Sequence, residues 1–128
     1  MPEKSIYLCV QKDILPSLKW ILEDYQNRVQ IRMINSPEKV TGAVDGRGSN
    51  VLILDADDLG KPLLELLNEL HREEKNTNTI LIIPPTASRE DIMEIIKASL
   101  VKGIVVRPFT AEVVSKYIDK ILGLEAVQ

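Results

Sequence analysis

Carboxylates gather directly after an apolar run in the middle of the sequence. Residues 51–54 are consecutively apolar, which indicates a strand buried on both faces, and the run ends on Asp55. Asp57 and Asp58 follow at once. Open parallel sheets bind ligands outside the carboxyl ends of their strands, so Asp55 lies where such a fold does its chemistry. Asp55 and Asp57 are the candidate metal ligands, although paired aspartates after a strand are more often solvated turn residues.

Short apolar stretches alternate with helical patterns along the whole chain. Three stretches are nearly continuous and are expected to be inner strands: 5–10, 51–55 and 79–83. The stretch over 29–34 alternates like an edge strand, and the one over 104–106 is short. The expected N-cap residues of the helices between these strands are Asp13, Ser36, Ser88 and Thr110. This repetition predicts an α/β fold: a flavodoxin-like, doubly wound (βα)5 domain with a parallel five-stranded sheet of order 2-1-3-4-5.

Size and composition bound the kind of protein. The chain has 128 residues, 45% hydrophobic and 27% charged, and is expected to form one domain over 1–124 with a tail over 125–128. A net charge of −3 and the lack of a long apolar run favour neither nucleic acid nor a membrane as partner. The single cysteine, Cys9, is interpreted as a small hydrophobic residue of a buried strand, which suits the cytoplasm.

Three motifs, in order, resemble a response-regulator receiver domain over about residues 5–122. Residues 51–55 resemble the strand that ends in the phospho-accepting aspartate. The pair Thr86-Ala87 resembles the hydroxyl residue and alanine that follow the fourth strand. Residues 103–109 resemble the segment that ends in Lys-Pro-Phe. The separation of Asp55 from Arg107, 107 − 55 = 52 residues, suits the family.

The resemblance implies transfer of a phosphoryl group from a partner's phosphohistidine to Asp55. It also implies a magnesium ion held by the acceptor and by two acidic residues after the first strand, with a hydroxyl and a lysine on the phosphoryl oxygens. Thr86 and Arg107 occupy these last two positions. Cations are needed because an aspartyl phosphate gathers several negative charges. A cis Arg107–Pro108 peptide bond is implied as well.

The sequence departs from this pattern at several positions. Gln11 and Lys12 replace the acidic pair, so anionic metal ligands are missing and Lys12 brings a positive charge instead. Arg107 replaces the lysine, which keeps the charge but not the compact ammonium, and Ile104 replaces an aromatic switch residue. We therefore expect a degenerate receiver domain without a cofactor, in which Lys12 and Arg107 pair with the Asp55 carboxylate.

The function that follows is a two-component-type signalling module, not an enzyme, which acts mainly through protein–protein interaction. A histidine kinase or an output protein is the expected partner. The fourth helix, fifth strand and fifth helix are the expected face for this partner and for a homodimer, if the chain self-associates. Trp20 lies off the stripe of the first helix and is interpreted as the rim of the core rather than a partner contact.

Two other functions remain open. The first is a working phospho-accepting receiver, which would use Asp55 with an atypical magnesium site. The second is an unrelated flavodoxin-like enzyme or nucleotide-binding protein, against which stands the lack of a glycine-rich phosphate loop after the first strand.

Overall fold

The computed structural model describes residues 4–44, 49–72 and 77–124. The strands are β1 (Lys4–Cys9), β2 (Gln30–Met33), β3 (Ser49–Asp55), β4 (Thr77–Ile83) and β5 (Gly103–Val106). The α-helices are α1 (Leu15–Leu22), α2 (Val40–Ala43), α3 (Lys61–Arg72), α4 (Arg89–Lys97) and α5 (Ala111–Leu122), with 3-10 turns η1 (Glu23–Tyr25) and η2 (Pro37–Lys39). The tail expected over 125–128 lies outside the described residues.

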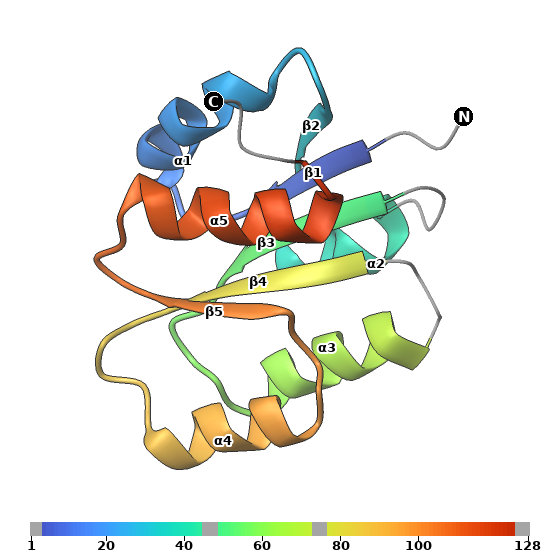
Figure 1. Cartoon of the computed structure of the whole chain (residues 1–128). Coiled ribbons are helices and arrows are strands. Elements are labelled where there is room, and N and C mark those ends of the chain that lie inside the picture. Colours follow the sequence, from blue (N-terminus) through green and yellow to red (C-terminus); the bar gives the residue numbers. More distant parts are fainter. Residues whose placement is uncertain (1–3, 45–48, 73–76, 125–128) are drawn as a thin grey trace.

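The strands form one parallel sheet in the order β2-β1-β3-β4-β5, which confirms the predicted topology (Figure 1). β3 is the central strand, with β1 on one side and β4 on the other. Its last residue, Asp55, is level with Ile82 of β4. Asp55 therefore reaches the carboxyl edge of the sheet at its middle, between the loops that follow β1, β4 and β5.

Helices cover both faces of the sheet. α1 and α5 pack on one face against side chains such as Ile53 and Ile80, and α2, α3 and α4 pack on the other against side chains such as Leu52 and Leu81 (Figure 1). These four side chains are 0% exposed. Fully burying one aliphatic side chain stabilises a fold by about 1.5–3 kcal/mol. The two cores hold β3 from both sides and so fix the position of Asp55.

Three of the four predicted N-cap residues stand at the start of a helix, and the one at Asp13 is wrong. The Ser88 hydroxyl accepts a hydrogen bond from the Asp91 amide at 3.1 Å, and the Thr110 hydroxyl accepts one from the Val113 amide at 3.4 Å. Ser36 stands at the N-cap of η2 with a proline after it, as predicted, but its side chain makes no capping hydrogen bond. α1 begins after Ile14 rather than after Asp13, with a proline in its first turn. Because proline has no N–H, a capping side chain finds one backbone donor fewer in this first turn.

The periphery of the fold differs from the sequence expectation in two places. β2 is the expected edge strand, but it is only four residues long and its Met33 is 48% exposed. Trp20, expected at the rim of the core, is 68% exposed. α1 buries Leu18, Ile21 and Leu22, so Trp20 falls on the opposite, solvent-facing side of that helix.

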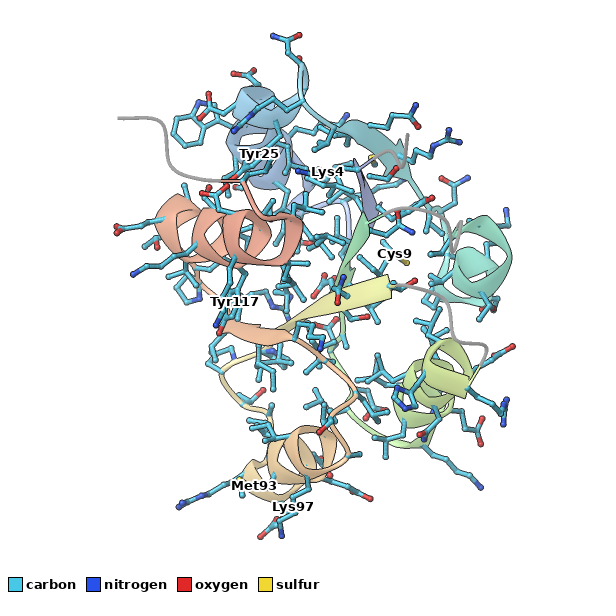
Figure 2. The ribbon with its side chains drawn as sticks, turned by 45° about the vertical axis from the view of Figure 1, so that its right-hand side comes forward. Lys4, Cys9, Tyr25, Met93, Lys97 and Tyr117 are labelled. Carbon is cyan, nitrogen blue, oxygen red and sulfur yellow. The ribbon has the colours of Figure 1, made fainter. Side chains whose placement is uncertain are left out.

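Three local features support the carboxyl edge and the core beside it. The Arg107–Pro108 peptide bond is cis, as expected. Gly103 lies under the Tyr117 ring of α5, where an added Cβ would come within 2.6 Å of that ring. Cys9 is buried, as expected, and burial raises the pKa of its thiol to about 11, so it stays a neutral core side chain (Figure 2). No helix in the described ranges is long and apolar enough to span a bilayer.

Candidate functional site

The candidate site is the Asp55 carboxylate at the end of β3. The Asp55 side chain is 0% exposed. Its Oδ2 accepts a hydrogen bond from the Gln11 backbone amide at 3.2 Å. Its Oδ1 is buried and accepts no hydrogen bond from any described residue. The nearest cation to Oδ1 is the Arg107 guanidinium, whose Nη1 lies 3.8 Å away. One oxygen of the Asp55 carboxylate therefore accepts a backbone hydrogen bond, and the other has only the nearby guanidinium charge.

Arg107 is positioned by the end of β5. Its backbone amide donates to the Ile83 carbonyl at 2.9 Å, which extends the β4–β5 ladder by one residue. Its side chain is 18% exposed and turns back over the edge of the sheet, where Nη2 donates to Oδ1 of Asp57. Its Nε is buried and donates to no described residue. The guanidinium thus bridges two carboxylates that lie two residues apart in the same turn.

Gln11, after β1, completes the arrangement. Its side-chain amide donates to Oδ2 of Asp57, while its backbone amide donates to Oδ2 of Asp55. Both oxygens of Asp57 are therefore engaged, one by Gln11 and one by Arg107. We refer to Gln11, Asp55, Asp57 and Arg107 together as the strand-end cluster. It ties the loops after β1, β3 and β5 to one another.

The two carboxylates of the strand-end cluster have opposite pKa shifts. Burial raises the pKa of Asp55, and the Gln11 hydrogen bond and the Arg107 charge lower it only in part. The hydrogen bond from the Gln11 side chain, followed by that from Arg107, lowers the pKa of the exposed Asp57. Asp57 also raises the pKa of Arg107. Arg107 is therefore held more firmly by Asp57 than by Asp55.

The expected ion pair between Lys12 and Asp55 is wrong. Within the described residues, Arg107 is the ion-pair partner of Asp55, and the Lys12 side chain is exposed. The physical reason lies in the turn after β1, where Gln11 directs both its backbone amide and its side chain to the two aspartates. Lys12 follows on the outer side of this turn. The other expected pair of Asp55, with Arg107, is present as a long contact.

The remaining positions of the resemblance lie around the strand-end cluster. Thr86 is exposed in the turn after β4, where the Ala87 amide donates to the Pro84 carbonyl at 3.2 Å. Ile104 is half-buried and packs against the core under α3 and α4. An aliphatic side chain at this position cannot act as the aromatic switch that the resemblance implies. Thr86 places a hydroxyl at the carboxyl edge of the sheet, and Ile104 stands where the resemblance implies an aromatic residue that would respond to it.

A cleft of about 480 Å³ opens between α2 and α3 beside Asp55. Its ionisable lining residues are all acidic: Glu38, Asp55, Asp57, Asp58, Glu65 and Glu69. Like charges at this density repel an approaching anion. The electrostatic surroundings of Asp55 on this side thus disfavour an anionic phosphoryl donor.

The donors do not fit the magnesium site that the resemblance implies. Magnesium requires an octahedron of oxygen ligands at close distance. Of the carboxylates near Arg107, Asp57 has both oxygens engaged and Asp55 has one engaged by a backbone amide. Within the described ranges, no group of three or more His, Cys, Asp or Glu side chains is arranged to hold a metal ion. The positive charge at the strand-end cluster comes from the guanidinium.

No family model matches the sequence, and no curated protein sequence matches it either. Solved structures do match the fold. A signal receiver domain of a putative Luxo repressor protein from Vibrio parahaemolyticus superposes with a TM-score of 0.77 at 11% identity, covering 96% of this chain and 92% of its own. A CheY-like response regulator receiver domain from Methanospirillum hungatei has a TM-score of 0.73 at 17% identity, with 96% and 95% covered. A signal receiver domain of an HD domain-containing protein from Pseudomonas fluorescens has a TM-score of 0.73 at 15% identity, with 96% of each covered.

The chain therefore has the receiver-domain fold, as the sequence motifs suggest. The similarity to these structures lies in the fold, whereas the strand-end cluster is formed by this chain's own residues. Sequence reasoning selected Asp55, Arg107 and Gln11 but missed that Gln11 and Arg107 meet on Asp57. The i, i+2 spacing of Asp55 and Asp57 is the signal that could have found this, because both side chains leave one short turn at the same edge.

Proposed function

We propose that the chain is a degenerate receiver module of a two-component-type signalling system, which works in the cytoplasm through protein–protein contacts and catalyses no reaction. The observation that carries this proposal is the Arg107 guanidinium, which lies between Asp55 and Asp57. It supplies within the chain the positive charge that a metal ion would otherwise bring to these carboxylates.

The strand-end cluster opposes phosphorylation in three ways. A phosphoryl group on Asp55 Oδ1 would displace the guanidinium 3.8 Å away, which Asp57 holds in place. Gln11 and Lys12 provide no anionic ligand for a metal ion that could assist the transfer. The acidic cleft between α2 and α3 repels a donor anion from the other side. Each effect raises the barrier to the same reaction.

The partner-binding surface is proposed to be the α4–β5–α5 face, defined by four exposed apolar side chains: Met93, Ile96, Val106 and Val113. Their exposed fractions are 41%, 52%, 47% and 41%. Figure 2 shows Met93 and Lys97 projecting from α4 away from the sheet. Apolar side chains ringed by charges are the usual composition of a transient protein interface. The partner would be a signalling protein, either a histidine kinase or an output protein.

A second copy of the chain is the other occupant that the sequence predicts for this face. Val106→Asp adds a charge to this patch and should abolish a complex that uses it, and sedimentation of the chain alone shows whether the lost complex is a homodimer. We assign the face to a different protein, since self-association has a better-supported surface, described below.

The proposal is tested by incubating the chain with magnesium and acetyl phosphate and recording its intact mass. The wild-type chain should gain no phosphoryl group. The positive control is Gln11→Asp combined with Lys12→Asp and Arg107→Lys, which restores the acidic pair and the lysine, and its negative control adds Asp55→Asn. A phosphoryl adduct on wild-type Asp55 would contradict the proposal and favour the working-receiver alternative.

A further inference from the structure

The outer edge of the sheet at β2 has backbone groups directed to solvent. β2 pairs with β1 on one side, and in the described part of the chain it is the last strand of the sheet. The Ile34 amide donates to the Leu8 carbonyl at 2.8 Å. Alternate residues of a parallel strand point their backbone groups to opposite neighbours, so Arg32 also faces β1, whereas Ile31 and Met33 face outward. This edge can accept another strand.

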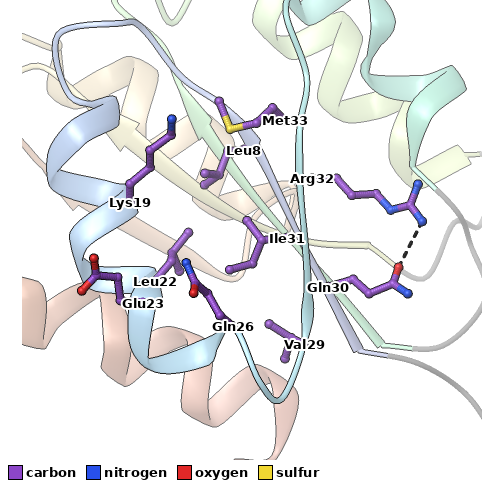
Figure 3. A pocket seen from close by; sticks show the side chains of 10 residues that line it. All are labelled: Leu8, Lys19, Leu22, Glu23, Gln26, Val29, Gln30, Ile31, Arg32 and Met33. Carbon is purple, nitrogen blue, oxygen red and sulfur yellow. Dashed lines mark hydrogen bonds between the residues drawn. The ribbon is translucent and has the colours of Figure 1, made fainter.

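A groove of about 900 Å³ runs beside this edge, between α1 and β2. Leu22 and Ile31 lie on its floor, and Lys19 of α1 and Glu23, the first residue of η1, form its wall (Figure 3). Met33 lies at its upper end and is 48% exposed. α5 packs against α1, and the groove lies between α1 and β2.

The dimensions of the groove suit a second α1. Neighbouring strands lie about 4.8 Å apart, so two copies of α1 whose axes lie two strand spacings apart above a sheet continued through β2 are separated by about 10 Å. Packed helices are separated by about 8–10 Å. A copy of α1 would therefore fill the space beside the first one without leaving a gap.

The charges on the groove wall are self-complementary. Lys19 and Glu23 are four residues apart, and because Glu23 caps the C-terminus of α1 with helical backbone angles, both side chains line the same groove. A twofold axis makes the two α1 helices antiparallel, so Lys19 of each copy faces Glu23 of the other. The register of the strands follows from the same reasoning. An axis through Ile31 places Gln30 opposite Arg32, a pair that already bonds within one chain at 3.0 Å, whereas an axis through Arg32 would oppose two guanidinium groups.

We propose that a second copy of this chain binds at the β2 edge, forming an antiparallel β2–β2 pair with α1 against α1. The resulting C2 dimer has one continuous sheet across both copies. Because β2 and β5 are opposite edges of the sheet, the dimer leaves the α4–β5–α5 face open for a different protein. It does not depend on the proposed function, because it rests on a separate surface.

The dimer is tested by sedimentation velocity over a range of concentrations of the whole chain. Lys19→Glu and Glu23→Lys each place like charges across the axis and should weaken dimerisation about tenfold or more. The double variant Lys19→Glu with Glu23→Lys restores opposite charges and should regain the dimer. Both positions are exposed, so the variants should fold, which circular dichroism checks.

A backbone variant tests the strand pairing itself. Met33→Pro removes an outward-facing amide that makes no bond within the sheet, so it should abolish dimerisation, while Met33→Ala should retain most of it. A chain that stays monomeric at every concentration overturns the proposal. So does a dimer that Val106→Asp dissociates and Met33→Pro leaves intact.

Discussion

The Nη1 atom of Arg107 lies 3.8 Å from Oδ1 of Asp55, across 107 − 55 = 52 residues of sequence. The contact joins the ends of β5 and β3, which are separated in the sheet by β4. Its length shows a compromise, because Asp57 binds the same guanidinium more closely. The buried Asp55 carboxylate is therefore compensated in part, and this partial compensation determines how the domain should respond to substitution and to pH.

Arg107→Ala should lower the free energy of unfolding by about 2 kcal/mol. The substitution leaves a fully buried carboxylate without its cation, and an unsatisfied buried group costs about 1–3 kcal/mol. Urea unfolding monitored by circular dichroism measures the change. Lys102→Ala, which removes an exposed cation next to β5, is the matched control and should be nearly neutral.

Combining Arg107→Ala with Asp55→Asn tests the cause of that loss. If the cost comes from the unpaired Asp55 charge, it should be clearly smaller in the Asp55→Asn background. An equal cost in both backgrounds would show that Arg107 acts through packing or through Asp57 instead.

The stability of the domain should fall as the pH rises through the raised pKa of Asp55. An unfolded aspartate titrates near 3.8, and burial raises the folded value above this. Between the two values the folded state binds more protons than the unfolded state, so stability decreases with rising pH across this window. Thermal unfolding measured upward from well below pH 3.8, in wild type and in Asp55→Asn, checks the prediction.

Asp57 changes the stability with pH in the opposite direction to Asp55, and the Asp55→Asn variant separates the two contributions. Its folded pKa is lowered, so its contribution is present above pH 3.8 and is lost as the pH falls. The Asp55→Asn variant keeps Asp57, so it should lose the decline at higher pH and retain the loss at acid pH. A profile of Asp55→Asn that parallels wild type would show that Asp55 is not the titrating group.

Much of the fold was predictable because it depends on apolar patterning. The nearly continuous apolar runs that became β1, β3 and β4 gave the inner strands, and the weak alternation of β2 gave an edge. Side-chain direction in short turns was not predictable in the same way. Nothing in the order Gln11-Lys12 says which residue faces Asp55, and the structure places the glutamine there and the lysine outside. The cap at Asp13 was also wrong, because α1 begins after Ile14 and has Pro16 in its first turn.

Tyr25→Phe should lower the free energy of unfolding by about 1 kcal/mol. The Tyr25 hydroxyl lies 2.6 Å from Oδ1 of Asp119 and donates to it, linking η1 to α5, and burial together with this bond raises the pKa of Tyr25 to about 12. Its stabilising contribution is full below pH 10 and should decline as the pH rises toward 12. Urea unfolding at neutral and at high pH measures both effects.

Tyr117→Phe is the control for this experiment. The Tyr117 hydroxyl makes no hydrogen bond to the described residues, and a phenylalanine ring at this position should pack over Gly103 as the tyrosine ring does. Equal losses for the two substitutions would contradict a specific role for the Tyr25–Asp119 bond.

The most direct test of the proposed function is a two-dimensional NMR titration of the labelled chain with magnesium and beryllium fluoride, a mimic of the phosphoryl group. Because the Arg107 guanidinium already lies between Asp55 and Asp57, the amide signals of Gln11, Asp55, Thr86 and Arg107 should show no saturable change. Saturable, magnesium-dependent shifts at these amides that disappear in Asp55→Asn would contradict the account and show that the chain is a working receiver domain.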